Sequence, residues 1–220
     1  MNDNEKLFFD ACAQGNAQIV NDLLGQGVDV NLVNGEFRTG LMRASKRGNT
    51  DVVLVLLKHH ANPNLLDFNH KTALMGAAKK GHDAIVNALI HASVNIQDNN
   101  GRTALMRAAF LGHYEVVLLL LDADGDVNLG DSMGRTALME ACLTYRMDII
   151  KLLLDRGADV NARDINGCSA LMRASYSGYV ELVKYLLDHG ADKELTDHEG
   201  QKAIHYVRDY NFDTLKPYLK

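Results

Sequence analysis

The spacing of hydrophobic and polar residues along this chain predicts pairs of short helices separated by polar loops. Around the middle of the chain, the apolar residues within 138–142 have helical spacing, and an aliphatic run at 149–154 follows a short polar turn. Thr136 can cap the first of these helices through its hydroxyl group, and Gly157 allows the second to stop in a left-handed conformation. The polar stretch that follows, up to Gly167, predicts a projecting loop with a tight turn, which we call a finger.

This pattern is periodic. Near copies of the segment Thr136–Ala141 begin at Thr39, Thr72, Thr103 and Ser169, so successive starts lie 33, 31, 33 and 33 residues apart. A period of this length indicates an array in which each unit buries its apolar face only against its neighbours. We therefore expect one elongated domain over residues 1–220, whose first and last units act as caps. The approximate units are 2–33, 34–66, 67–97, 98–130, 131–163, 164–196 and 197–220.

Three short motifs accompany the period. Asp-x-x-Gly-x-Thr-Ala-Leu occurs at Asp98 and Asp131, Gly-His turns lie at 81–82 and 112–113, and Gly-Ala-Asp begins at Gly157 and Gly190. With these motifs, nearly the whole chain resembles the ankyrin repeat family. The resemblance implies a mainly α solenoid of about seven stacked helix-turn-helix units with projecting β-hairpin-like loops. It also implies that a partner protein binds on the concave face, which the finger tips and the first helices form.

The chain departs from the family pattern at several positions. Methionine takes the place of the family's histidine at Met42, Met75, Met106, Met139 and Met172. Because methionine cannot donate a hydrogen bond, we expect cohesion between the fingers to depend more on packing. Tyr145 stands where a turn glycine is expected, and we predict that the turn is re-routed there. Phe37 and His70 replace glycines of the fingers, and the unit from Asp67 is two residues short, which predicts a curtailed second helix or loop.

Composition limits the function classes. The formal net charge of −5 disfavours a general affinity for nucleic acid. The three cysteines show no CxxC spacing, which fits a reducing compartment, so we expect a cytoplasmic protein. No stretch approaches the roughly 18 apolar residues of a membrane span, and the charged start at 3–6 is unlike a signal peptide. We expect a monomer without a membrane partner.

Residue types that carry catalysis or bind metals do not converge. Cys12 and Cys142 occupy equivalent positions four units apart, so they should lie about 35 Å apart and cannot share a metal. His59 and His60 are adjacent and point two ways on a helix end, which favours a solvated pair over metal ligands. We find no phosphate-binding loop, serine-nucleophile elbow or zinc-protease motif. The sequence therefore predicts no catalytic residues, no metal site, no cofactor and no enzyme activity.

The resemblance places certain positions of the first helices on the binding face. The residue type at these positions changes along the chain. They are basic at Lys46-Arg47 and Lys79-Lys80, apolar at Phe110-Leu111 and Leu143, and aromatic at Tyr176. Exposed apolar residues flanked by charge are typical of a partner surface. The alternative is that Phe110 and Leu111 are partly buried and that the basic residues only solvate the protein.

Arginines one step after the methionine, at 43, 107 and 173, either extend this surface or pair with nearby acids. The candidate partner-binding residues are Arg43, Lys46, Arg47, Lys71, Lys79, Lys80, Arg102, Phe110, Leu111, Met133, Arg135, Leu143 and Tyr176. Arginine and aromatic anchors among them would carry most of the binding energy.

These residues support two hypotheses from different classes. The first is a non-catalytic scaffold that binds a protein on its concave face, with an acidic or mixed segment at the basic end and an apolar anchor near Phe110 and Leu143. The alternative is a binder of nucleic acid or another anionic ligand through the basic patch near Lys46 and Lys79. Base-stacking aromatic residues are not interleaved with this patch, which favours the first hypothesis.

Overall fold

The structure, a computed structural model, describes residues 2–220 and is mainly helical. Within these residues the only β-type pairings are two isolated bridges, Val33 with Thr39 and Arg163 with Ser169, both at the base of a finger. The chain forms two compact units. Unit 1 comprises the chain up to Ala108 together with Glu115–Gly125, and unit 2 comprises Ala109–Tyr114 and Asp126–Lys220.

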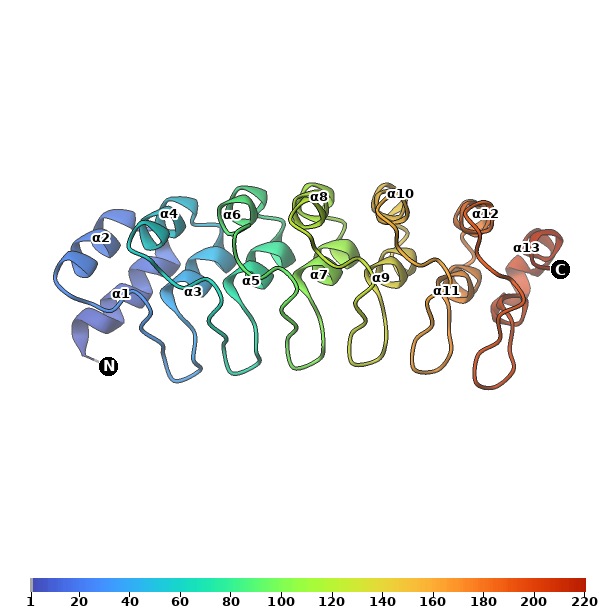
Figure 1. The fold of residues 1–220 in the computed structure, drawn as a ribbon, viewed down its shortest axis with the longest axis horizontal. Helices are drawn as coiled ribbons and strands as arrows, with labels where there is room; N and C mark the ends of the chain where they lie inside the picture. Colours follow the sequence, from blue (N-terminus) through green and yellow to red (C-terminus); the bar gives the residue numbers. More distant parts are fainter. Residues whose placement is uncertain (1) are drawn as a thin grey trace. The chain divides into compact units, whose positions relative to one another are not determined.

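Unit 1 is built from pairs of short helices. Its helices are α1 (Asp3–Gln14), α2 (Ala17–Gly25), α3 (Gly40–Arg47), α4 (Thr50–Lys58), α5 (Ala73–Lys80), α6 (Asp83–Ala88), most of α7 (Ala104–Leu111) and α8 (Tyr114–Asp122). The first helices α1, α3 and α5 pack side by side in one layer, and α2, α4 and α6 form a second layer (Figure 1). A finger precedes α3, α5 and α7 and projects from the first-helix layer.

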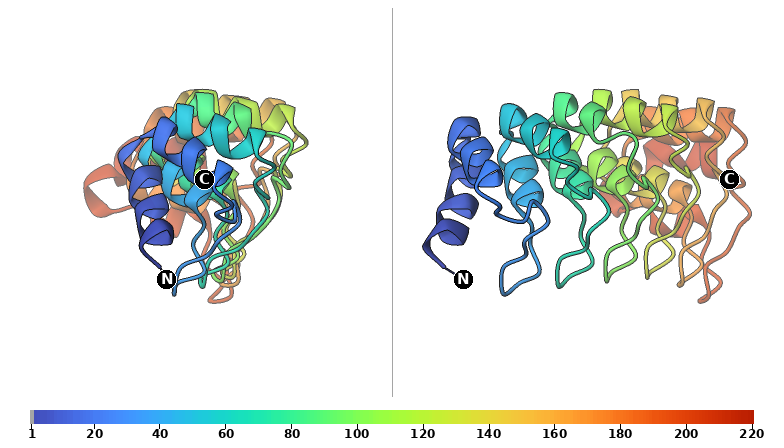
Figure 2. Two further views of the ribbon diagram at one scale, coloured as in Figure 1. Left: turned by 90° about the vertical axis from the view of Figure 1, so that its left-hand side faces the viewer. Right: turned by 60° about the vertical axis from the view of Figure 1, so that its left-hand side comes forward.

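Unit 2 repeats this arrangement. It contains α9 (Ala137–Leu143), α10 (Met147–Asp155), α11 (Ala170–Ser177), α12 (Val180–Asp188), two short 3₁₀ segments, η1 (Ala203–Tyr206) and η2 (Asp209–Asn211), and α13 (Phe212–Leu219). The first helices α9 and α11 pack together, and η1 continues their layer. Helix α10 packs on α9, α12 packs on α11, and the fingers of this unit project to one side (Figure 2).

A side-chain hydroxyl group caps the first helices α3, α5, α7, α9 and α11, whereas the side chain of Asn2 caps α1. The side-chain oxygens of Thr39, Thr72, Thr103, Thr136 and Ser169 accept the backbone N–H of the methionine three residues later, at 3.2–3.4 Å. Each bond satisfies one of the donors that a helix start leaves unpaired. The cap predicted at Thr136 is confirmed, as is the left-handed stop at Gly157, where φ is 84°.

The prediction that Tyr145 re-routes its turn is wrong. Tyr145 takes the left-handed conformation of the glycine that it replaces, with φ of 55°. The N–H of Arg146 donates to the carbonyl of Ala141 at 3.0 Å, which closes this turn as in the other repeats. Phe37 and His70 likewise keep the left-handed backbone of the finger glycines, with φ of 57° and 56°.

An aromatic contact explains how Tyr145 is tolerated. At Gly15, Gly48, Gly112 and Gly178, a side chain of the following repeat lies directly over the glycine, as His82 does over Gly48. A tyrosine leaves no room for that arrangement. Tyr179 of the next repeat instead stacks on Tyr145, with ring centroids 4.4 Å apart and an interplanar angle of 23°. Such a stack offsets part of the cost of a left-handed tyrosine.

The short repeat from Asp67 has the curtailed second helix that the sequence predicts. Helix α6 contains 6 residues, whereas α4 and α8 contain 9 each. The missing residues are therefore taken from the end of the second helix, and the first helix α5 keeps its 8 residues.

Cohesion between neighbouring repeats is both apolar and polar. The methionines at the family's histidine position are buried, with Met106, Met139 and Met172 each 1% exposed. Polar ladders add to this packing. The side chain of Asn161 accepts the N–H of Asp192 at 2.8 Å and donates to the carbonyl of Gly190 at 3.0 Å, and both acceptor and donor lie in the next repeat. Packing is thus accompanied by side-chain to backbone bonds across the repeats.

The stack between Tyr145 and Tyr179 predicts different effects on stability for two substitutions at one site. Tyr145→Ala loses the stack but keeps a left-handed residue with a Cβ atom, so it should lower the free energy of unfolding by about 1 kcal/mol. Tyr145→Gly loses the stack and also removes the backbone penalty, so it should remain within about 0.5 kcal/mol of the wild type. Urea unfolding followed by circular dichroism measures both. Equal stability of the alanine variant and the wild type would contradict this account.

Candidate partner-binding surface

Unit 1 contains a hollow of about 440 Å³, lined by α3, α5 and the fingers that precede them. We call this hollow the basic pocket, because Lys and Arg predominate among its lining residues and Asp67 is the one acid there. The lining residues are Ala13, Arg38, Met42, Arg43, Lys46, Arg47, Asp67, Lys71, Thr72, Met75, Gly76, Lys79, Lys80 and Arg107. Cationic side chains from three successive repeats therefore converge on one concavity.

One repeat contributes no long side chain to the lining of the basic pocket at a position where both of its neighbours contribute an arginine. The residue after the methionine is Arg43 in the preceding repeat and Arg107 in the following one, but it is Gly76 in the repeat between them. A Cβ atom at Gly76 would lie 3.5 Å from the Cβ of Lys46, an ordinary contact, so the position is not closed by its neighbours. Glycine here leaves space where the other repeats place a long side chain.

Several cations of the basic pocket have no counter-charge close by. Among the residues that the structure describes, Lys46, Arg47, Lys71 and Lys80 make no ion pair with a carboxylate. Burial lowers the pKa of Lys79, and the positive charges around it, that of Arg107 foremost, lower this pKa further. The cations therefore repel one another, and a bound anion would relieve this repulsion.

Buried carboxylates at the start of the fingers decide which arginines are engaged. Arg107 pairs with Asp98, and Arg173 pairs with Asp164 at 2.6 Å. The Asp164 carboxylate also accepts the N–H groups of Asn166 and Cys168 at 2.9 Å each, which shapes the finger turn. Arg107 and Arg173 therefore pair with nearby acids, which is one of the two alternatives that the sequence left open; the other was that they extend the binding surface.

Arg43 is different because its own finger begins with a neutral residue. Asn34 replaces the aspartate, and its side-chain oxygen accepts the N–H groups of Glu36 and Arg38 at 3.0 and 2.9 Å. No carboxylate therefore draws Arg43 toward its finger. The Arg43 guanidinium lies over the ring of Phe9 instead, 5.0 Å from the ring centroid, and lines the basic pocket.

Unit 2 contains a second hollow, of about 300 Å³, which we call the aromatic hollow. It is lined by Leu143, Asp164, Asn166, Cys168, Arg173, Tyr176 and Tyr206. The Tyr206 hydroxyl donates to the Asp197 carboxylate at 2.5 Å, and this bond holds the pKa of Asp197 below its usual value. The Sγ atom of Cys168 lies 3.1 Å from the same hydroxyl. Because these polar groups are paired, the hollow presents mainly the Leu143 and Tyr176 side chains, 38% and 49% exposed.

The structure brings together some of the predicted binding residues and separates others. The basic pocket collects Arg43, Lys46, Arg47, Lys71, Lys79 and Lys80, and the aromatic hollow collects Leu143 and Tyr176. Arg102, Phe110, Leu111, Met133 and Arg135 line neither hollow. Phe110 is half-buried, as the alternative interpretation held, whereas Leu111 is exposed. Their role in partner binding stays a prediction.

Arg135 already has partners within the protein. Its guanidinium donates to the Asp131 carboxylate at 2.8 Å and lies 3.6 Å from the buried Glu140 carboxylate. Burial by itself raises the pKa of Asp131, but the hydrogen bonds from Arg135 and Met133 outweigh burial and leave this pKa below its usual value. Glu140 occupies the position of Arg107 and Arg173 in its repeat, so Arg135 supplies the positive charge there.

Sequence reasoning missed two residues that shape the hollows, Gly76 in the basic pocket and Tyr206 in the aromatic hollow. A signal for Gly76 was present, because aligning the repeats shows glycine where the neighbouring repeats have arginine. No comparable signal points to Tyr206, whose contact with Cys168 joins positions 38 residues apart.

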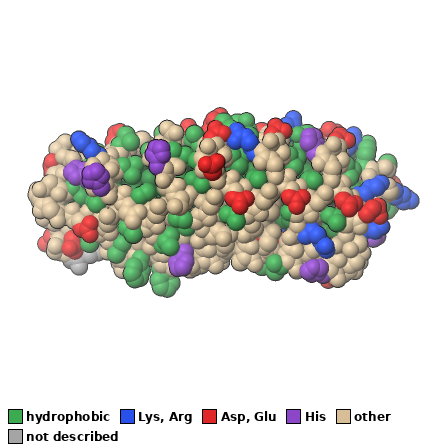
Figure 3. Space-filling model, in the orientation of Figure 1, with side chains coloured by type: hydrophobic (Ala, Val, Ile, Leu, Met, Phe, Trp, Pro, Cys, Tyr) green, Lys and Arg blue, Asp and Glu red, His purple; other side chains and the backbone are tan. Residues whose placement is uncertain are grey.

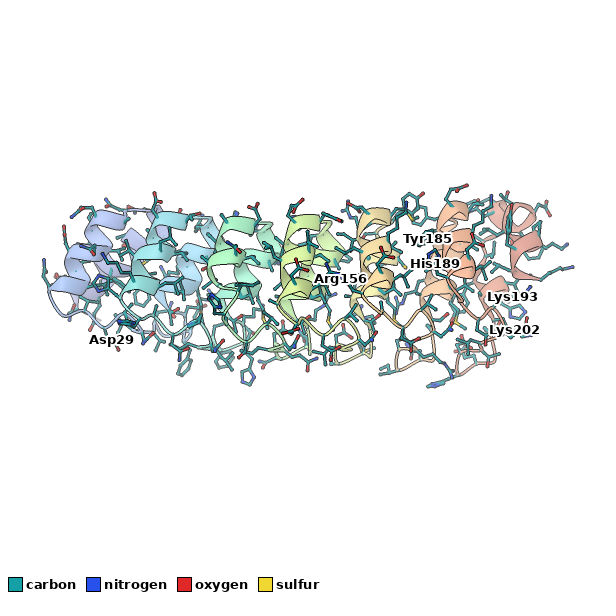
Figure 4. All side chains as sticks on the ribbon, turned by 45° about the horizontal axis from the view of Figure 1, so that its top comes forward. Asp29, Arg156, Tyr185, His189, Lys193 and Lys202 are labelled. Carbon is teal, nitrogen blue, oxygen red and sulfur yellow. The ribbon has the colours of Figure 1, made fainter. Side chains whose placement is uncertain are left out.

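Surfaces away from the hollows show ordinary mixing of residue types. On the face of unit 1 seen in Figure 3, hydrophobic, acidic and histidine side chains are interspersed. In unit 2, Tyr185 of α12 and His189, which directly follows this helix, lie together (Figure 4), with ring centroids 3.9 Å apart, and the Nζ atom of Lys151 lies 5.7 Å from the Tyr185 centroid. These side chains serve as partners for one another.

Groups that could perform chemistry are dispersed in the described part of the chain. Residues 2–220 contain no group of three or more His, Cys, Asp or Glu side chains placed to hold a metal ion. Burial raises the pKa of the Cys12 and Cys142 thiols to about 12, so neither is a thiolate at neutral pH. Over the same residues, none of the helices has the length and apolar character needed to cross a membrane.

Comparison with known proteins identifies the class. The family model for ankyrin repeats matches residues 8–98, 74–164, 123–197 and 163–216, so the chain belongs to the ankyrin repeat family. Its fold class is the mainly α ankyrin-repeat solenoid that the sequence predicts. Domains of this family are generally protein-interaction modules and are typically not catalytic.

Two solved structures illustrate the similarity. The human ASB11 ankyrin repeat domain has a TM-score of 0.84 and 27% sequence identity over 96% of each chain. The ankyrin repeat domain of Bcl-3, described as a unique member of the IkappaB protein family, has a TM-score of 0.84 and 29% identity, over 95% of this chain and 97% of its own. The search of curated proteins found no match.

The pair formed by Arg173 and Asp164 yields a stability prediction. Arg173→Met leaves a buried carboxylate without its cation, which should lower the free energy of unfolding by about 2–3 kcal/mol. Adding Asp164→Asn should restore most of this loss, because Asn34 makes the same finger bonds without a charge. Thermal and urea unfolding of the single and double variants measure both steps. If the double variant were no more stable than Arg173→Met, the lone carboxylate would not be the cause.

Proposed function

We propose that this protein is a non-catalytic module that binds a partner protein on the face formed by its first helices and fingers, the concave face of the family. The observation that carries the proposal is the basic pocket, in which cations of three successive repeats converge. Long side chains of one sign repel one another, so folding alone gives no reason to gather them. A partner of opposite charge gives such a reason.

The two hollows suit different parts of a partner. In unit 1, Lys46 and Lys80 are exposed at the edge of the basic pocket and would steer an acidic segment toward it. In unit 2, the aromatic hollow with Leu143 and Tyr176 would take an apolar side chain. Both hollows are formed before any partner binds, so little conformational entropy is lost on association.

Nucleic acid is the second candidate, because it would meet the same cations. A single strand usually binds where aromatic side chains stack on its bases between basic residues. The residues that line the basic pocket include no Phe, Tyr, Trp or His side chain. The net charge of −5 also opposes the approach of a polyanion. A protein with a localised negative charge is therefore the better fit.

Charge reversal at the basic pocket tests this function. The double variant Lys46→Glu/Lys79→Glu should reduce recovery of the partner proteins from an extract by about tenfold or more, which corresponds to ~1.4 kcal/mol. Quantitative mass spectrometry of proteins captured on the immobilised variant and wild type measures the change. Circular dichroism should show unchanged helix content.

Lys58→Glu is the matched control. Lys46 and Lys58 both lie in the last turn of a helix, so reversing either charge opposes the helix dipole in the same way. Lys58 belongs to the second helix α4 and does not line the basic pocket. Loss of the same partners with Lys58→Glu, or their retention with the double variant, would rule out binding at this surface.

A further inference from the structure

We infer that the basic pocket binds a phosphate ester carried by the partner, such as a phosphoserine or phosphothreonine side chain. This inference rests on the proposed function and adds the chemistry of the group that is recognised. Three features support it: the surplus of positive charge, the space above Gly76 and the kinds of donor that surround this space.

The surplus of positive charge exceeds what a single carboxylate can neutralise. Two arginines of the pocket are neutralised internally, since Arg38 lies 3.5 Å from the Asp67 carboxylate and Arg107 pairs with Asp98. Beyond these, Arg43, Lys46, Arg47, Lys71 and Lys80 form no ion pair within the described residues. A phosphate ester carries a charge of roughly −1.5 to −2 at neutral pH on one compact group, whereas a carboxylate carries −1.

Several carboxylates of one peptide could not easily replace that phosphate. In an extended segment, successive side chains point to opposite sides, so only one of two adjacent acids can enter a given pocket. The cations of the basic pocket that form no ion pair come from α3, α5 and the finger before α5, around a single hollow rather than along a stripe. A compact dianion matches this arrangement better than a row of single charges.

The basic pocket as a whole has the size that such a group requires. The volume of about 440 Å³ exceeds what a tetrahedral phosphate on a short side chain occupies, so waters or neighbouring peptide atoms can enter with it. The repeats on either side, with Arg43 and Arg107 at the equivalent position, do not leave this room. Glycine at this single repeat therefore singles out the basic pocket from the rest of the surface.

The donors around this space suit phosphate. Arg43 and Arg47 present planar guanidinium groups, which bind two phosphate oxygens at once, and the lysines add mobile point charges. Arg43 is also held in place over the Phe9 ring, 5.0 Å from its centroid, which reduces the entropy lost when it engages a ligand. Arginine forks together with lysines are the usual means by which proteins recognise phosphorylated side chains.

A titration with defined peptides tests the inference. The probes are three nine-residue Gly/Ala peptides that carry phosphoserine, glutamate or serine at the centre, with hexathymidylate as a fourth probe. Chemical-shift changes of ¹⁵N-labelled protein report both affinity and location. The phosphoserine peptide should bind at least about tenfold more tightly than the glutamate peptide, the equivalent of one additional charge-assisted hydrogen bond. The largest changes should fall on residues that line the basic pocket.

Gly76→Arg separates a shaped pocket from general attraction. In the equivalent repeats Arg107 and Arg173 pair with the acid nine positions earlier, so an arginine at 76 should fill the pocket and pair with Asp67. The variant should lose phosphopeptide binding about tenfold or more although it adds a positive charge. Gly76→Ala is the matched control, because a methyl group fits beside Lys46 and should leave binding unchanged.

Three outcomes would overturn the inference. They are equal affinity for the phosphoserine and glutamate peptides, undiminished binding by Gly76→Arg, or tighter binding of hexathymidylate than of the phosphopeptide, which would favour nucleic acid. Phosphatase treatment of the extract separates this failure from failure of the proposed function. Partners that are recovered equally after phosphatase, but are still lost with Lys46→Glu/Lys79→Glu, would leave the protein-binding function intact and remove the phosphate ester.

Discussion

A buried carboxylate at the start of every finger but the one that begins with Asn34 is the constraint from which much of this structure follows. Asp98 and Asp164 each bind two backbone N–H groups of their own finger turn and also need a positive partner, because an unpaired charge is costly away from water. Arg107 and Arg173 supply that partner from the following first helix. The finger and the helix of one repeat are thereby held together by a charge pair.

Repeats that lack the aspartate or the arginine of this pair determine where unpaired positive charge lies on the surface. Where Asn34 replaces the aspartate, Arg43 needs no local acid and becomes part of the basic pocket. Where Gly76 replaces the arginine, Asp67 is approached by Arg38 of the preceding finger, and space opens beside it. Two substitutions in the repeat pattern thus create both the free cation and the room for a ligand, and neither disturbs the backbone.

Unit 2 resolves the same constraints without a surplus of charge. Glu140 takes the position of the arginine, and the Arg135 guanidinium supplies the positive charge for the carboxylates of both Asp131 and Glu140. In the last finger a hydroxyl group, that of Tyr206, replaces the cation beside Asp197. Because the polar groups neutralise one another, the surface that remains is apolar and aromatic. The difference between the two hollows therefore comes from how each repeat satisfies its buried acid.

The sequence by itself determined the repeat, the paired helices and the family, because apolar periodicity, hydroxyl caps and turn glycines are local features that recur. It also selected the exposed lysines of α3 and α5, since helical spacing fixes the face on which they lie. Only the tertiary structure decided which arginines are engaged, because pairing depends on residues nine or more positions away. It also decided that Tyr145 keeps the turn of a glycine, since the compensating ring of Tyr179 comes from the next repeat.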